Sequence, residues 1–294
     1  MSTNSHRSFN PKLLRHGRPI GYDVFRADIT DILTMPLVNQ PNTTWEYGIN
    51  IDWAGIYLER ATQVRLNDWI QTRICAPLNL QNITMLPTAS MKANLASMHQ
   101  RWPHDPSAQT HERDHIYPRP LKATTEPEIS AAFHSGGAGC FARPTEYCQI
   151  LTTLLNRGTH PKTQTTILQP STVASMFKSQ IPSMPNFARQ PIPAAKPEHT
   201  NPLPELYPQE GNPPQGWGLS FMLTHEACAT GRGEGAGYWA GIANLFWWAD
   251  PQRGVAGMIA SQVMPFGDLQ VMGQWGACEK AVYDALDAAG KGEA

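Results

Sequence analysis

Residues 237–248 read Gly-Tyr-Trp-Ala-Gly-Ile-Ala-Asn-Leu-Phe-Trp-Trp, and this aromatic-rich stretch decides the fold. Aromatic side chains favour the pleated surface of a β-sheet, so a strand is predicted from Tyr238 to Trp248. Runs of similar character predict two further strands, from Trp217 to Leu223 and from Val255 to Met264. The turn-forming residues Asp250 to Gly254 join the last two strands, and such a short connection predicts an antiparallel meander.

Helices are predicted on both sides of these strands. The segment from Leu269 to Ala289 carries an apolar stripe at helical spacing and is predicted to cover a face of the sheet. Before the sheet, one helix is predicted from Pro144 to just before Gly158, and a shorter one from Ser171 to Gln180. Two more are predicted from Asp52 and from Leu66, the latter ending at Pro77.

The predicted fold class is α+β, with an antiparallel β-sheet flanked by helices and a mainly helical subdomain. Residues 40–180 form the mainly helical region, and residues 216–294 hold the sheet strands and the C-terminal helix. Residues 182–214 are rich in proline and are predicted to be an excursion outside the core. The first forty residues and the segment 93–135 show no clear period and are predicted to be loops.

Composition excludes several classes of partner. The net charge of −1, with 16% charged residues, gives no field that would gather nucleic acid or an acidic membrane surface. No apolar run is long enough for a signal peptide or a membrane span, which predicts a cytoplasmic protein. Five scattered cysteines lack zinc-ligand spacing and are predicted to be reduced thiols. We expect no metal and no cofactor.

Two segments are candidates for chemistry. Tyr47 lies in the sequence Trp45-Glu46-Tyr47-Gly48-Ile49-Asn50, directly before a predicted helix, where its hydroxyl can face a cleft. Gly237 to Gly241 opens a strand with small residues beside a tryptophan, which lets a backbone N–H approach a ligand closely. A tyrosine packed in the core and a glycine kink for sheet packing are the alternatives, and the residues alone leave both open.

Taken in order, these segments resemble the serine β-lactamase-like superfamily of class C β-lactamases, esterases and DD-peptidases. The likeness is to its fungal transesterase branch, of the lovastatin acyltransferase type. Pro77-Leu78-Asn79-Leu80 resembles the Pro-Leu-Gly-Met segment of that family, and Gly136-Gly137-Ala138-Gly139 resembles its Gly-Gly-Ala-Gly segment. The resemblance implies the serine β-lactamase/transpeptidase-like fold, with residues 1–294 as a single partial domain.

The resemblance also implies roles for particular residues. In this family the serine of a Ser-x-x-Lys motif attacks the acyl carbon, and a tyrosine shares the general-base work. Tyr47 is the implied base partner, and Trp239, Ala240 and Gly241 form the implied substrate wall and oxyanion strand. Further pocket residues are implied by the same likeness: Trp45, Asn50 and Trp247. Trp239 stands where β-lactamases have a lysine, so a substrate carboxylate is disfavoured and an uncharged acyl ester or thioester is expected.

The expected function is therefore that of an acyltransferase or esterase in fungal secondary metabolism. Its expected partner is a small acyl substrate, including one carried as a thioester on a carrier protein. Residues 1–45 contain no Ser-x-x-Lys, so we expect an N-terminally incomplete chain that is inactive by itself. The alternative is a non-catalytic remnant or pseudoenzyme that binds an acyl ligand or a protein partner.

Other candidate groups are weaker. Ser175 and Lys178 have the Ser-x-x-Lys spacing but follow the tyrosine segment, which contradicts the family order. Ser135, before the glycine run, lacks the Gly-x-Ser-x-Gly frame and is interpreted as part of a tight turn. His111 and His115 can share a metal only if they lie on a helix. Three positions where the family has glycine in a turn hold other residues here, namely Asn42, Gln63 and Asn79.

Overall fold

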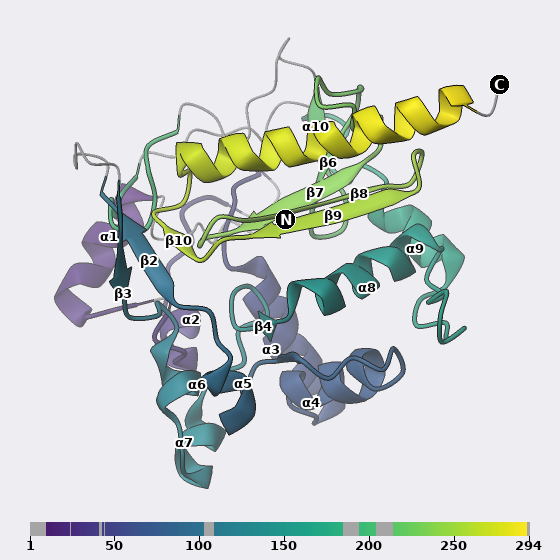
Figure 1. Cartoon of the computed structure of the whole chain (residues 1–294). Helices are drawn as coiled ribbons and strands as arrows, with labels where there is room; N and C mark the ends of the chain where they lie inside the picture. Colours follow the sequence, from purple (N-terminus) through teal and green to yellow (C-terminus); the bar gives the residue numbers. More distant parts are fainter. Residues whose placement is uncertain are drawn as a thin grey trace.

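The computed structural model describes residues 10–23, 25–40, 43, 45–102, 109–184, 194–203 and 214–292. Its main sheet has five antiparallel strands in chain order, as the predicted meander requires (Figure 1). These strands are β5 (Gln215–Trp217), β6 (Met222–Thr224), β7 (Gly237–Gly241), β8 (Leu245–Asp250) and β9 (Val255–Ala260). The α+β fold class is confirmed.

The predicted strand boundaries are wrong in three places. The run from Trp217 to Leu223 turns at Ser220, which has φ of 75°, and so forms two strands. The long run through Trp248 likewise turns at Asn244, with φ of 55°, which separates β7 from β8. The third run breaks after Ala260, and Val263–Met264 becomes β10 in a different sheet. Residues other than glycine carry these positive φ values, so no glycine marks these breaks in the sequence.

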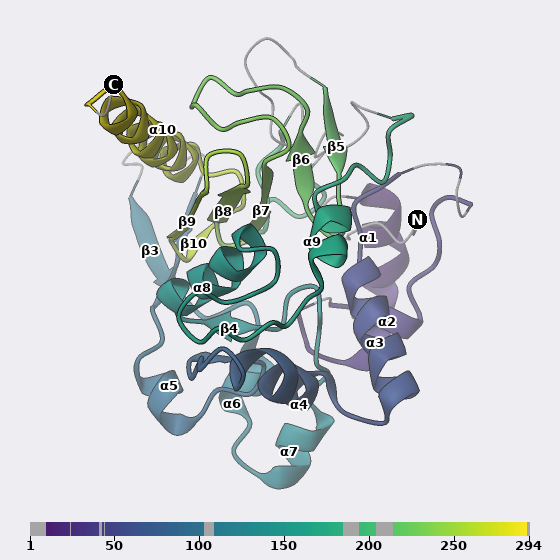
Figure 2. The same ribbon diagram turned by 90° about the vertical axis from the view of Figure 1, so that its right-hand side faces the viewer.

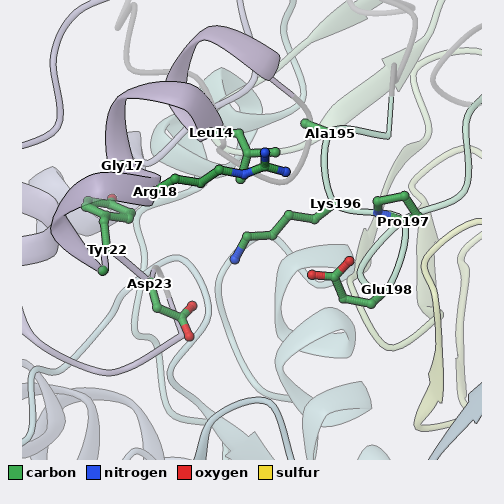
Figure 3. Close-up of a pocket in the computed structure, with 10 residues that line it drawn as sticks. Leu14, Gly17, Arg18, Tyr22, Asp23, Ala195, Lys196, Pro197 and Glu198 are labelled. Carbon is green, nitrogen blue, oxygen red and sulfur yellow. The ribbon is translucent and has the colours of Figure 1, made fainter.

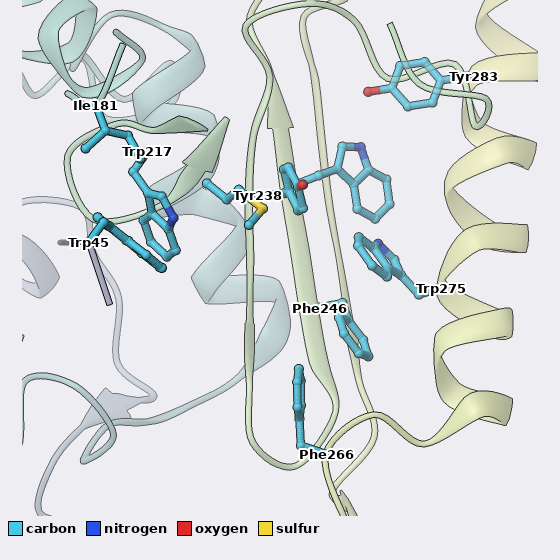
Figure 4. Packing of buried hydrophobic residues seen from close by; sticks show 10 residues of the cluster. Trp45, Ile181, Trp217, Tyr238, Phe246, Phe266, Trp275 and Tyr283 are labelled. Atoms are coloured by element: carbon cyan, nitrogen blue, oxygen red, sulfur yellow. The ribbon is translucent and has the colours of Figure 1, made fainter. Parts of the chain in front are cut away.

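Helix α10 (Leu269–Gly292) covers one face of the sheet, as its apolar stripe predicts (Figure 1). The ring of Trp275 stacks on Phe246, with 4.7 Å between centroids, and lies 6.4 Å from Tyr238. Figure 4 shows Trp275 and Tyr283 on the α10 side of the strands, and Trp45 and Trp217 on the other side. Because successive side chains of a strand alternate between faces, Trp239 lies on the face away from α10.

Helix α8 (Pro144–Leu155) lies on that second face, where it contacts β8 and β9. It begins as predicted, with Pro144 in the first helical turn, where its missing N–H costs nothing. Gly158, with φ of 92°, follows its end. Helix α9 (Pro170–Met176) comes next and ends sooner than predicted.

The helical region lies below the sheet in Figure 2. It contains α3 (Asn50–Thr62) and α4 (Leu66–Ile70), and α4 continues into one π-helical turn, η2 (Gln71–Cys75). Gln63 and Asn79 both adopt positive φ, 58° and 55°, which fits the resemblance, because the family has glycine at these two positions. Asn42 lies outside the described residues.

The two segments predicted to be loops contain regular structure, so those predictions are wrong. The first forty residues hold α1 (Pro11–Gly17), η1 (Arg18–Ile20) and α2 (Ile29–Leu33). The side chains of Asn10 and Asp28 cap α1 and α2 by accepting backbone N–H groups.

Residues 93–135 hold the end of α5 (Ala89–Ala93) and four further elements. These are β2 (Met98–Arg101), β3 (Thr110–Arg113), α6 (Pro118–Lys122) and α7 (Glu126–Ala131). Strand β2 pairs with β3 and, in parallel, with β10, while β1 (Ile83–Thr84) pairs with β4 (Phe141–Ala142). The proline-rich stretch 182–214 is described only in part, since 185–193 and 204–213 lie outside the described residues.

Candidate active site

Tyr47 lies in the extended segment before α3 and packs against the main sheet. Its ring centroid is 5.2 Å from that of Trp239 on β7 and 6.5 Å from that of Trp217 on β5. Trp217 also contacts Trp239 at 4.5 Å and Trp45 at 4.8 Å. The two segments singled out in the sequence thus meet in one aromatic cluster, formed by Trp45, Tyr47, Trp217 and Trp239.

The Tyr47 hydroxyl has a polar partner within this apolar cluster. Burial raises the pKa of Tyr47, and a side-chain hydrogen bond with Trp239 acts in the opposite direction. An indole N–H can only donate, so the Tyr47 oxygen is the acceptor. The nearby carboxylate of Asp52 raises the pKa of Tyr47 further. The hydroxyl is therefore protonated at neutral pH, with a lone pair held by the Trp239 indole.

The backbone of Ala240 lies on β7 beyond the residues that pair with β6. Thr224 donates its N–H to the carbonyl of Ala236, and Met222 pairs with Tyr238 in the same register. Alternate residues of a strand direct their backbone groups to the same edge, so Ala240 points toward β6. Strand β6 begins only at Met222 and does not extend along Ala240. The N–H of Ala240 is thereby directed toward the edge that β6 leaves uncovered.

Asp52 supports the segment that carries Tyr47. Its carboxylate lies in the first turn of α3 and is 5% exposed. It accepts the Ser135 hydroxyl at 2.5 Å and the backbone N–H of Gly137 at 3.2 Å. A Cβ atom on Gly137 would lie 2.8 Å from the same carboxylate, so only glycine allows this close approach. Burial raises the pKa of Asp52, and the two hydrogen bonds act in the opposite direction.

The remaining predicted pocket residues are placed differently. Trp247 packs against Phe221 at 5.6 Å and Tyr147 at 6.4 Å, and not against Tyr47. Asn50 begins α3, and its Oδ1 atom is buried without a hydrogen-bond partner among the described residues. Two residues that the sequence reasoning missed belong to the site, Trp217 and Asp52. An acid in the first turn of a helix was the available signal for Asp52.

The weaker candidates acquire structural roles. The Ser175 hydroxyl donates to the carbonyl of Ser171 in its own helix, and Lys178 lies beyond the end of α9. Ser135 donates to Asp52 and accepts the N–H of Ala138, which makes it part of a tight turn. His111 lies on strand β3, not on a helix. Among the described residues, no three histidine, cysteine or acidic side chains converge as metal ligands.

A charged cavity of about 380 Å³ lies elsewhere, between η1 and the segment around Lys196. Figure 3 shows Arg18 and Lys196 extending into it, with Asp23 and Glu198 across from them. None of the residues predicted for the site lines this cavity. In the described part of the chain, no helix has the length and apolar character needed to cross a bilayer.

Comparison with known proteins places these features in a family. The Beta-lactamase family profile matches residues 6–275. Monacolin J acid methylbutanoyltransferase from Aspergillus terreus is 29% identical over 259 residues, which are 85% of this chain and 57% of the relative. Lovastatin esterase from Penicillium rubens is 29% identical over 253 residues, 82% of this chain and 56% of the relative. The chain thus spans little more than half the length of these relatives.

Solved structures agree with this result. A mutant of simvastatin synthase from Aspergillus terreus superimposes with a TM-score of 0.78 at 27% identity. The match covers 98% of this chain and 64% of the synthase. The resemblance inferred from the ordered motifs is confirmed.

Proposed function

The chain belongs to the β-lactamase family, and from this premise we propose that it carries part of an acyl-transfer site for an acyl ester or thioester. The observation that supports this most directly is the contact between Tyr47 and Trp239. It brings a phenol hydroxyl beside a strand whose Ala240 N–H is directed toward the β6 side, where β6 has no residue paired with Ala240. Acyl transfer requires both a proton-transferring group and a hydrogen-bond donor for the developing oxyanion.

Each group has a distinct part in the proposed reaction. In a complete site of this kind, a hydroxyl nucleophile attacks the acyl carbon; Tyr47 takes the proton of that hydroxyl as it gives its own proton to the leaving alcohol or thiol, which leaves an acyl ester on the nucleophile. In the second half of the reaction, Tyr47 takes the proton of the accepting alcohol or water and returns a proton to the nucleophile oxygen. The Ala240 N–H donates to the carbonyl oxygen as negative charge develops on it. Release to an alcohol completes a transfer, and release to water completes a hydrolysis.

The proposed acyl group is uncharged. Trp45, Trp217 and Trp239 present an aromatic wall, and Trp239 supplies a neutral indole donor. The two fungal relatives are named for methylbutanoyl transfer and for ester cleavage. By analogy, we propose a short acyl group on a small molecule or on a carrier-bound thioester, in secondary metabolism. Because residues 1–46 hold no Ser-x-x-Lys, we propose that these 294 residues bind the acyl ligand without turnover.

Binding and turnover are tested separately on the purified chain. Butanoyl-N-acetylcysteamine, a carrier-free thioester, is titrated against tryptophan fluorescence. Trp239→Ala should weaken binding by about tenfold, the loss expected from removing an aromatic wall. Trp69→Ala, which removes a tryptophan of α4, is the matched control and should leave binding unchanged.

Turnover is followed as nitrophenol release from p-nitrophenyl butanoate, and none above background is expected. Release that disappears in Ser175→Ala would show a working nucleophile on α9 and overturn the proposed absence of turnover. Equal binding by wild type and Trp239→Ala would refute the aromatic wall. Binding of the thioester without nitrophenol release fits the pseudoenzyme form of the proposal.

A further inference from the structure

A second cavity, of about 400 Å³, lies at the start of α10, where that helix approaches β2 and β10 (Figure 1). Its volume falls within the range of small-molecule sites. Large apolar side chains supply much of its lining, among them Trp102, Leu203 and Leu269. The residues assigned above to proton transfer and to the oxyanion do not line it.

One wall of this cavity is held rigidly by a single buried side chain. Asn244 is fully buried, and its amide nitrogen donates to the carbonyls of Val263 and Pro265 at 2.7 and 2.8 Å. Its amide oxygen accepts the N–H groups of Gly267 and Asp268 at 2.9 and 3.2 Å. These four hydrogen bonds fix the segment from β10 to α10, so the cavity is formed before any ligand binds.

The charges that line the cavity neutralise one another. The Arg101 Nε atom lies 2.6 Å from a carboxylate oxygen of Asp268. The other oxygen of Asp268 accepts the N–H groups of Gln270 and Val271 and so caps α10. The Asn201 amide donates to the Gly267 carbonyl. An ionised ligand would compete with this pair, whereas an uncharged ligand leaves it intact.

The rim of the cavity exposes two large apolar side chains. Leu269 is 78% exposed and Trp102 is 49% exposed, although both line the cavity. Leu203, on the inner wall, also packs against the apolar core cluster of the main sheet, which includes Phe266 and Trp275. Leu203 is thereby shared between the cavity and that core.

We propose that this cavity binds an uncharged, largely apolar small molecule, which covers Trp102 and Leu269 on binding. Resting on the function proposed above, we assign the ligand as the apolar body of the ester substrate. The volume, the rigid wall and the internal pairing of Arg101 with Asp268 together specify this class of ligand.

The test uses N-phenyl-1-naphthylamine, an uncharged fluorescent probe that becomes bright in apolar surroundings. Trp102→Ala removes one wall, and Leu269→Lys places a charge at the rim. Each should raise the dissociation constant of the probe by about tenfold, as expected when an aromatic or aliphatic contact is lost. The matched controls are Tyr57→Ala, an aromatic that is 75% exposed on α3, and Leu286→Lys, 36% exposed on α10.

The outcomes separate this proposal from the catalytic one. Unchanged probe binding in Trp102→Ala and Leu269→Lys, or equal losses in the controls, would overturn the cavity as a binding site. Probe binding that persists in Tyr47→Phe supports the cavity irrespective of catalysis. Displacement of the probe by ethyl hexanoate supports the assignment to an ester, and failure of this uncharged ester to compete overturns that assignment.

Discussion

Replacing Asp52 tests whether the buried acceptor oxygen, and not the charge, secures the turn behind Tyr47. Asp52→Ala leaves the Ser135 hydroxyl and the Gly137 N–H without their acceptor in a site that is almost fully buried. Each buried donor left unpaired costs about 1–3 kcal/mol, so the free energy of unfolding should fall by about 3 kcal/mol. Asp52→Asn keeps an acceptor oxygen and removes the charge that burial disfavours, so its loss should be within about 1 kcal/mol.

The assay is urea unfolding followed by tryptophan fluorescence, with Ser135→Ala completing a double-mutant cycle. Ser135 and Asp52 should show a coupling free energy of about 1.5 kcal/mol or more, the value for a hydrogen bond to a charged group. A coupling below about 0.5 kcal/mol, or equal destabilisation by Asn and Ala at position 52, would refute the reasoning.

The free energy of unfolding of the wild type should also depend on pH through Asp52. Burial raises the pKa of Asp52 in the folded protein, so the folded state holds this proton more tightly than the unfolded state does. Stability then decreases as the pH rises through the window between the unfolded value, 3.8, and the raised folded value. The difference in unfolding free energy between wild type and Asp52→Asn should move in favour of Asn over that window.

Three further predictions concern stability. Gly137→Ala places a Cβ atom 2.8 Å from the Asp52 carboxylate and should lower the free energy of unfolding by about 1–3 kcal/mol. Gly273→Ala adds its Cβ atom in open space on α10 and should raise it by about 0.5–1 kcal/mol in the same urea assay. Arg232→Met removes the only cation that is paired with the buried Glu279 among the described residues, at 3.4 Å, and leaves it the Thr230 hydroxyl; the loss should be about 3 kcal/mol. Adding Glu279→Leu should recover most of this loss in thermal unfolding. Burial lowers the pKa of His134 from 6.5 to about 4, so the unfolded state binds more protons between these pH values, and the free energy of unfolding should fall as the pH drops from 6.5 to 4. His134→Gln should reduce this pH dependence. An unchanged pH dependence would argue against a neutral buried imidazole.

The strands of the main sheet were predictable because their pattern is local. An aromatic run and an apolar run separated by the Asp250–Gly254 turn have few alternatives to an antiparallel meander. The breaks at Ser220 and Asn244 were not predictable in the same way, because positive φ is uncommon for residues other than glycine, and asparagine adopts it at only some of its positions. Asn244 is held in this backbone conformation by its own side chain, which makes four hydrogen bonds to residues 263–268.

The N-terminal helices were missed although a signal for them was present. Asn10 followed by Pro11 is a helix start by residue type, and the structure uses Asn10 as the N-cap. Short helices carry too few apolar positions for their period to stand out, so caps are the more informative feature at that length. The antiparallel pair of β2 and β3 was not predicted because β3 is mostly exposed and lacks an apolar face.

The candidate site likewise contains residues that the sequence predicts and residues that it does not. Tyr47 and Trp239 were found through the order of the family motifs, and their contact at 5.2 Å brings those motifs together. Trp217 carries no motif, and its place in the cluster depends on the packing of β5 beside β7 through β6. Sequence order identifies the members that a family shares, and it cannot identify side chains that reach the site only through tertiary packing.

Trp239 shows how a substitution at one strand position changes the class of ligand. A lysine at this place would offer a cation to a carboxylate, whereas the indole offers one neutral donor, which it gives to Tyr47. The indole plane is meanwhile packed against Trp217 at 4.5 Å, and that contact favours an apolar neighbour. The cation closest along the chain, Arg232, lies over the ring of Tyr238 at 3.8 Å, on the α10 face of the sheet. These contacts of Trp239 support the proposal of an uncharged acyl group at this side of β7.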